Sequence, residues 1–207
     1  MNIFITGTDT NVGKTLISSW IALHARFAYF KPIQTGLNQG ADSQQVKELS
    51  NAKIYPEIYA YQDPVSPHLA ARIKNDTIDI EKILLPKKDN LIIEGAGGVL
   101  VPINDKYLMV DLIKKLGAPV ILIARTTLGT INHALLSLEI LRSRNIPVLG
   151  VIMNGEQNID NSNAIKFYGG APILAEFPKL ESVNINTLKS VELPKKLQQL
   201  FLEVETI

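Results

Sequence analysis

The chain has 207 residues, 46% hydrophobic and 20% charged, which suffices for one substantial core and favours a single domain spanning residues 1–207. Its 21 basic and 20 acidic residues leave a formal net charge of +1, so the composition does not predict binding to nucleic acid. The sequence contains no cysteine, which excludes disulfides and thiolate chemistry, and no apolar run approaches the roughly 18 residues of a membrane span, so we expect a cytoplasmic protein without a membrane partner.

Short apolar runs alternate with helical patterns along the chain. Strands are expected at residues 3–5, 27–30, 91–93, 120–123 and 148–153. Helices are expected at residues 14–25, 42–50, 67–74, 110–116, 131–144 and 194–203. This alternation predicts an α/β fold, with a P-loop-type parallel sheet covered by helices on both faces and ligands at the carboxyl ends of its strands. Segments 54–67 and 156–163 are expected to be surface loops, the second of them mobile.

A phosphate-binding loop is expected between the first strand and the first helix, where residues 7–15 read GTDTNVGKT. The backbone N–H groups of such a loop and the positive end of the following helix dipole surround phosphate oxygens. Lys14 would reach the β- and γ-phosphates, and the Thr15 hydroxyl would bind Mg²⁺. The loop is a variant, because the common pattern has glycine where Thr8 stands. The residues expected to bind the nucleotide are Asp9, Thr10, Asn11, Val12, Gly13, Lys14, Thr15 and Leu16.

Two polar residues follow the second predicted strand. Lys31 comes directly after it, and a turn containing Thr35 comes next. A lysine at a strand end can stabilise charge on a transferring phosphoryl group, although such lysines are more often simply solvated. Asp42 begins a predicted helix, where it either caps the helix or binds a metal ion.

An acid of the Walker B type is expected at Glu94, because it ends an apolar strand and a glycine-rich turn follows it. A carboxylate at a strand end beside a phosphate loop can hold Mg²⁺, since this hard cation prefers oxygen ligands. Taken alone, Glu94 could equally be a solvated acid. Together with the phosphate loop, it predicts a magnesium site.

Four segments occur in the order in which they are found in one known family. They are GTDTNVGKT at 7–15, KPIQTG at 31–36, EGAGG at 94–98 and LGTINHA at 128–134. In combination they resemble the dethiobiotin synthetase family, and the resemblance spans residues 1 to about 154. It implies an ATP- and Mg²⁺-dependent ligase that carboxylates 7,8-diaminopelargonate with CO₂. A carbamate and then a carbamic-phosphoric anhydride would lead to dethiobiotin, ADP and phosphate.

The resemblance also implies roles for individual residues. The catalytic set would be Lys14, Lys31, Thr10 and Thr35, and the Mg²⁺ ligands would be Thr15, Asp42 and Glu94. The substrate contacts would be Thr10, Lys31, Thr35, Gly95, Ala96, Gly97, Gly129, Thr130, Ile131 and Asn132. In the family the segment at 129–132 comes from the neighbouring subunit, which implies a homodimer with a shared active site.

The base site is the least familiar part of the sequence. Asn154 stands where the family hydrogen-bonds adenine, but the stretch from Gly155 to Gly170 looks short. We therefore expect a reduced preference for ATP, so that other nucleoside triphosphates serve as well.

Two other classes of protein fit parts of the pattern. A partition or delivery ATPase acting as a regulatory dimer would carry a lysine where Asp9 stands, and the tail from residue 193 to 207 lacks a basic amphipathic pattern. An amidoligase would usually carry a glutaminase domain, for which this chain is too short.

Overall fold

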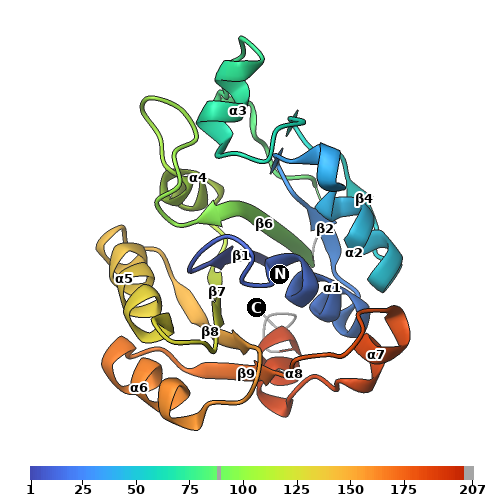
Figure 1. The fold of residues 1–207 in the computed structure, drawn as a ribbon, viewed down its shortest axis with the longest axis vertical. Coiled ribbons are helices and arrows are strands. Elements are labelled where there is room, and N and C mark those ends of the chain that lie inside the picture. The colour runs from blue at the N-terminus through green and yellow to red at the C-terminus, as the bar shows by residue number, and fades with distance from the viewer. Residues whose placement is uncertain (88–89, 203–207) are drawn as a thin grey trace.

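The computed structural model describes residues 1–87 and 90–202. Its centre is a seven-stranded sheet in the order β4-β2-β6-β1-β7-β8-β9, with neighbouring strands parallel (Figure 1). These strands are β1 (Asn2–Gly7), β2 (Ala28–Phe30), β4 (Ile54–Tyr55), β6 (Leu91–Gly98), β7 (Val120–Arg125), β8 (Val148–Asn154) and β9 (Ile173–Phe177). Two further short strands, β3 (Ile33–Gln34) and β5 (Tyr59–Ala60), pair with each other.

Helices cover both faces of the sheet, as Figure 1 shows. On one face lie α1 (Lys14–Ala25), α2 (Asp42–Ser50), α7 (Ile185–Ser190) and α8 (Lys195–Leu202). On the other lie α4 (Met109–Leu116), α5 (Thr130–Ser143) and α6 (Ile159–Gly169), with α3 (Pro67–Ile73) beyond the edge of the sheet. The prediction of an α/β fold with a parallel sheet is confirmed.

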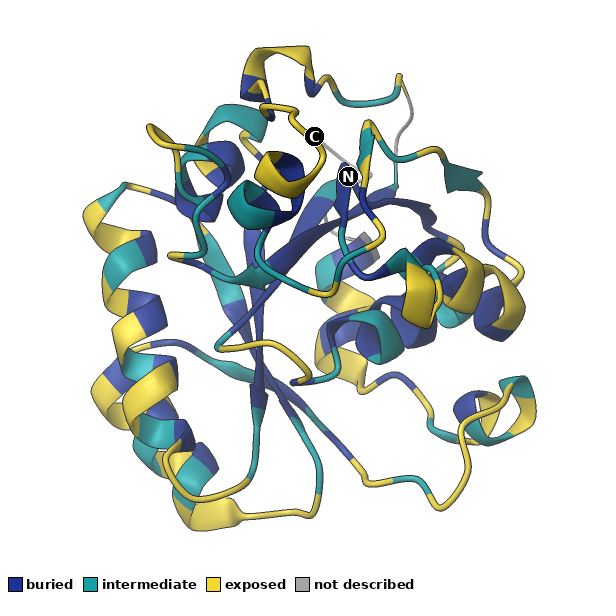
Figure 2. Cartoon of the chain, turned by 45° about the horizontal axis from the view of Figure 1, so that its top comes forward, coloured by how far each residue is buried: buried dark blue, intermediate teal, exposed yellow. Residues whose placement is uncertain are grey.

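The central strands β1, β2, β6 and β7 are buried on both faces, because successive side chains point to opposite sides and helices cover each side. In β1, Ile3 and Ile5 pack in one cluster with Trp20 of α1, whereas Phe4 packs in another with Met109 of α4. The middle of the sheet is accordingly mostly dark blue in Figure 2, while some strand ends and short strands are teal and the helices alternate between buried and exposed residues. This double burial explains why the strands are near-continuous apolar runs.

The order of the strands positions the site. β1 lies at the middle of the sheet, between β6 and β7. The strands β2, β4 and β6, which follow β1 in the sequence, lie on one side of it, and β7, β8 and β9 lie on the other. Ligand sites in such sheets lie at the carboxyl ends of the strands, where the winding changes direction. Gly7 ends β1 and Lys31 directly follows β2, so both lie at this edge. The predicted end of the strand at Glu94 and the glycine-rich turn after it are wrong, because β6 continues through these glycines to Gly98. Glu94 therefore lies inside β6, set back from the edge and paired with Ile5 of β1.

The predicted mobile loop at 156–163 is wrong for most of its length, because α6 begins at Ile159. Its helix start is capped by Asn158, whose side chain accepts a hydrogen bond from the Asn161 backbone. Asparagine and aspartate favour both loops and helix N-termini, so the composition of this stretch indicated the wrong alternative.

Other differences are smaller. The predicted loop at 54–67 contains the short strands β4 and β5. The elements β9 and α7 were not predicted from the sequence. The last predicted helix is α8, and its expected final residue, Glu203, lies outside the described residues, as does the end of the 193–207 tail. In the part of the chain that the structure describes, no helix has the length and apolar character needed to cross a bilayer.

Candidate active site

The phosphate loop joins β1 to α1 and is fastened to a strand two places along the sheet. Gly13 adopts a φ of +96°, and a Cβ atom at this position would lie 2.1 Å from Nδ2 of Asn154. Only glycine fits both the backbone conformation and the space. The Asn154 amide donates to the Val12 carbonyl at 2.9 Å, so β8 holds the loop in place.

Lys14 begins α1 and folds back over the loop. Its ammonium donates to the Asp9 carbonyl at 2.9 Å, and only 7% of the residue is exposed. Burial lowers the pKa of Lys14 from 10.5 to about 8, against the raising effect of Glu94. The Asp9 carboxylate in turn accepts hydrogen bonds from the Thr10 backbone at 2.7 Å and from Arg125 at 2.5 Å.

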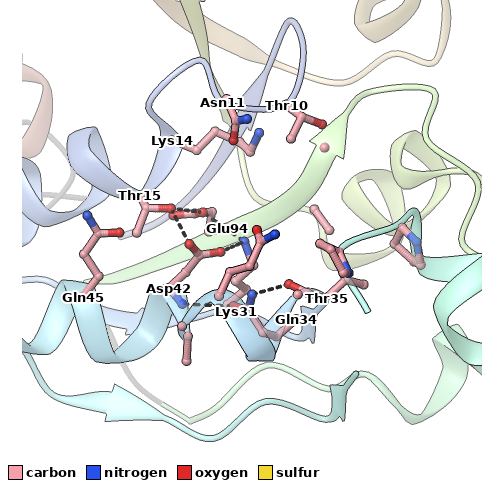
Figure 3. Close-up of a pocket in the computed structure, with 18 of the residues that line it drawn as sticks. Thr10, Asn11, Lys14, Thr15, Lys31, Gln34, Thr35, Asp42, Gln45 and Glu94 are labelled. Atoms are coloured by element: carbon pink, nitrogen blue, oxygen red, sulfur yellow. Dashed lines mark hydrogen bonds and ion pairs between the residues drawn. The ribbon is translucent and has the colours of Figure 1, made fainter. Parts of the chain in front are cut away.

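An acidic cluster lies beside the loop, formed by Glu94 within β6, Lys31 directly after β2 and Asp42 at the start of α2. The Thr15 hydroxyl lies 3.0 Å from Oδ1 of Asp42 and 2.9 Å from Oε1 of Glu94. The Lys31 ammonium lies 2.5 Å from Oδ2 of Asp42 and 3.1 Å from Oε1 of Glu94. Figure 3 shows these four side chains pointing toward one another.

Two members of the cluster are closed to solvent, since Glu94 is fully buried and Lys31 is 4% exposed, whereas the Asp42 side chain is 29% exposed. Burial favours the neutral form of Lys31, but Glu94 and Asp42 outweigh it and raise the Lys31 pKa above its ordinary value. Burial also opposes ionisation of Asp42, yet the Lys31 ammonium lowers the Asp42 pKa below its usual range. Lys31 and Asp42 are therefore both charged at neutral pH.

The donor atoms of this cluster fit a hard divalent cation. Thr15 contributes a hydroxyl, and Asp42 and Glu94 each contribute a carboxylate. Both carboxylates lie within hydrogen-bond distance of Thr15 Oγ1. Mg²⁺ is commonly bound by one or two carboxylates, with phosphate oxygens and water as further ligands. The three residues predicted to hold the metal thus lie together.

A cavity of about 920 Å³ opens above the loop and the acidic cluster. The predicted site residues along its wall are Thr10, Asn11, Gly13, Lys14, Thr15, Leu16, Lys31, Thr35, Asp42, Glu94, Ala96 and Gly97. Apolar side chains form another part of the wall, namely those of Val65, Pro67 and Val101. The cavity therefore combines a polar phosphate end with an apolar surface.

Other predicted residues lie away from this wall. Asp9 and Val12 belong to the loop but not to the cavity lining, and Gly95 packs against Phe4 inside the sheet. Asn154 is engaged by the loop carbonyl. The segment at 129–132 begins α5, at the end of β7, and does not line the cavity of its own chain among the residues described.

Three residues with contacts to the site were missed by the sequence analysis. Ser18 of α1 donates to Oε2 of Glu94 at 2.8 Å, and the Gln34 side chain accepts from the Asp42 backbone at 3.2 Å. Arg125 ends β7 and pairs with Asp9. Arg125 shares with Lys31 a position at the carboxyl end of a strand, which is the signal that could have found it. Ser18 carries no such signal.

Comparison with known proteins adds independent information. Residues 1–187 match the family described as AAA domain. The chain is 53% identical to the ATP-dependent dethiobiotin synthetase BioD of Lawsonia intracellularis, over 98% of this chain and 100% of that protein. It is 46% identical to the protein of the same name from Paramagnetospirillum magneticum, over 93% and 95% of the two chains.

Among solved structures, a ParA family ATPase from Chlorobium tepidum TLS superposes with a TM-score of 0.59. The alignment covers 97% of each chain at 14% sequence identity, so it shows a shared fold alone. The fold is thus common to partition-type ATPases and to this chain, whereas the close sequence relatives carry the name of a ligase.

Proposed function

The chain belongs to the family of ATP-dependent dethiobiotin synthetases, ligases of biotin biosynthesis that form C–N bonds, and we propose how its cavity carries out the reaction. The proposed substrates are 7,8-diaminopelargonate, CO₂ and ATP. One amine of the diamine adds to CO₂, losing a proton and giving a carbamate. The carbamate oxygen attacks the γ-phosphorus, which releases ADP. The second amine then attacks the carbonyl carbon of the carbamic-phosphoric anhydride, and phosphate leaves as the ring closes.

The observation that carries this proposal is the meeting of two lysines and an acidic cluster around one phosphate loop. Lys14 would hold the β- and γ-phosphates, and Lys31 would stabilise the charge on the phosphoryl group during transfer. Support comes from the contact of Lys31 with Asp42 and Glu94, which fixes its ammonium beside Thr15, directly after Lys14. Catalysis would then rest on positioning and electrostatics, without a protein nucleophile.

Thr15, Asp42 and Glu94 would hold Mg²⁺. When bound, the ion would neutralise charge on the β- and γ-phosphate oxygens. Lys31 pairs with both carboxylates in this structure, and its ammonium lowers the pKa of Asp42, so the Asp42 carboxylate is ionised and suited to a cation. The residues that hold the metal and the residue that meets the transferring group are therefore in direct contact.

The diamine would lie between the phosphate end and the apolar wall of the cavity. Thr10 and Thr35 would contact its amines or the carbamate, and Ala96 and Gly97 leave room for the substrate to approach the backbone. The methylene chain of the diamine suits the surface formed by Val65, Pro67 and Val101. Gly95 lies within β6 and packs against Phe4, so it would act only through the course of the strand.

We also propose that the carboxylate tail is bound by a second copy of the chain. Helix α5 begins after Gly129, and its first N–H groups together with Asn132 suit an anion. Because this segment does not line the cavity of its own chain among the described residues, a homodimer with shared sites accounts for it best. Asn154 would contact the base, and a cytoplasmic location stays a prediction.

The decisive experiment measures phosphate release from ATP. We expect release to require diamine, bicarbonate and Mg²⁺ together, with dethiobiotin formed in equal amount. A steady ATPase rate that does not respond to the diamine would contradict the proposal and favour the partition-type alternative.

A further inference from the structure

We propose that Ser18 is a positioning residue that orients Glu94 for metal binding, an inference that rests on the magnesium site of the proposed function. Ser18 lies on α1, four residues after Lys14 and therefore on the same side of the helix. It is fully buried, and its hydroxyl donates to Oε2 of Glu94 at 2.8 Å across the gap between α1 and β6.

The two oxygens of Glu94 have different partners. Oε1 lies 2.9 Å from the Thr15 hydroxyl and 3.1 Å from the Lys31 ammonium, at the centre of the acidic cluster. Oε2 faces the helix and accepts from Ser18. Because the terminal torsion of a glutamate is broad, this bond to Oε2 keeps Oε1 turned toward Thr15 and Asp42. Ser18 thus fixes the oxygen that would face the cation.

The neighbouring serine shows what a purely structural role looks like. Ser19 is also fully buried on α1, but its hydroxyl donates to the Thr15 backbone carbonyl at 2.7 Å. A bond to the carbonyl four residues back is the usual arrangement for a serine within a helix. Ser18 instead bonds to a carboxylate on a different element. Partners of metal ligands typically change metal affinity or activity about 10- to 100-fold when removed.

The experiment compares Ser18→Ala with Ser19→Ala and the unmodified protein. Mg²⁺ binding to the complex with a non-hydrolysable ATP analogue is measured by titration calorimetry, and the Mg²⁺ dependence of phosphate release is measured beside it. We expect Ser18→Ala to bind Mg²⁺ about tenfold more weakly, with its rate approaching that of the unmodified protein when Mg²⁺ is saturating. Ser19→Ala should match the unmodified protein in both measurements.

Two results would overturn the inference. One is an Mg²⁺ affinity of Ser18→Ala equal to that of Ser19→Ala, and the other is a loss of rate that saturating Mg²⁺ does not recover. If Ser18→Ala does not fold, Ser18→Cys nearly keeps the size of the side chain with a weaker donor, and it should bind Mg²⁺ more weakly than the unmodified protein, by less than about tenfold; an unchanged affinity would again overturn the role of Ser18. Failure of the proposed function is seen separately, as phosphate release by the unmodified protein that is independent of Mg²⁺ and diamine.

Discussion

The end of the site that transfers the phosphoryl group and the end that binds the base and the substrate tail differ in how completely one chain forms them. At the phosphoryl-transfer end, Asp42 and Glu94 are already joined to both Thr15 and Lys31 by short contacts, and Lys31 and Glu94 are buried. At the other end, Asn154, expected to contact the base, is occupied by the Val12 carbonyl. The helix start at 129–132, assigned to the substrate tail, does not reach the cavity among the described residues.

This difference follows from what each end must do. Groups that stabilise a transition state are most effective when their orientation is fixed before the substrate arrives. Contacts to the base and to the substrate tail supply binding, and they can form when the ligand or a second copy arrives. We therefore expect substitutions at the first end to change the rate most, and those at the second to change binding.

The largest effect is expected from Lys31→Met, which removes the ammonium from the completed end. The rate of phosphoryl transfer should fall about 100-fold or more, because the developing charge loses its nearest cation. Glu94 would also lose the counter-ion of a buried charge, so the free energy of unfolding should fall by about 3 kcal/mol. Single-turnover phosphate release and thermal unfolding measure the two effects.

The matched control for Lys31→Met is Lys47→Met on α2, an exposed lysine whose ammonium donates to the Ala52 carbonyl at 3.2 Å and which does not line the cavity among the described residues. It should leave the rate unchanged. If the rate of phosphoryl transfer falls by less than about tenfold in Lys31→Met, Lys31 contributes to binding of the ground state and not to the transition state. The contrast between the two ends would then be lost.

The next effect concerns the end that we assign to a second copy of the chain. Asn132→Ala should raise the KM for the diamine about tenfold, with a smaller change in kcat, because it removes a contact to the substrate tail and none to the reacting atoms. Analytical ultracentrifugation would test the dimer itself.

A mixture of two variants distinguishes shared sites from separate ones. In a heterodimer of Lys31→Met with Asn132→Ala, one site combines the intact Lys31 of one chain with the intact Asn132 of the other. Random pairing of equal amounts should restore about a quarter of the normal activity at limiting diamine. Activity no higher than the average of the separate variants would show that the tail segment does not serve a partner.

A smaller effect is expected for the choice of nucleotide. Because Asn154 is already bonded to the loop and the following segment is short, rates with ATP, GTP and CTP should lie within about tenfold of one another. Initial rates at matched concentrations measure this. A strong preference for ATP would mean that Asn154, or residues of α6, recognise the base more closely than the isolated chain indicates.

The same contrast describes what could be predicted from the sequence. The phosphate loop and Glu94 were found because a strand, a short motif and a helix are adjacent in sequence and leave a local signature. Lys31 and Asp42 gained weight only through the family resemblance, since their approach to Glu94 depends on the order of the strands. Ser18 could not be distinguished from Ser19, because which face of α1 meets β6 is decided by packing. The helix after Asn158 was missed because its capping residues are also loop formers.

The smallest expected effect is a proton taken up when the nucleotide binds, and it tests how Lys14 is prepared for the phosphates. With a pKa of about 8, Lys14 is about half protonated in the free protein at pH 8, although the same lysine in an unfolded chain would be charged up to about 10.5. The stability of the free protein should therefore rise with pH between these values, because only the unfolded state still holds the proton there.

Phosphates stabilise the charged form of Lys14, so binding a non-hydrolysable ATP analogue at pH 8 should take up about half a proton. Calorimetry in buffers of different ionisation enthalpy measures this uptake, and Lys14→Met should abolish it. Equal proton uptake by the unmodified protein and by Lys14→Met would assign the proton to another group. Lys14 would then be less prepared for the phosphates than the acidic cluster beside it is for its ligands.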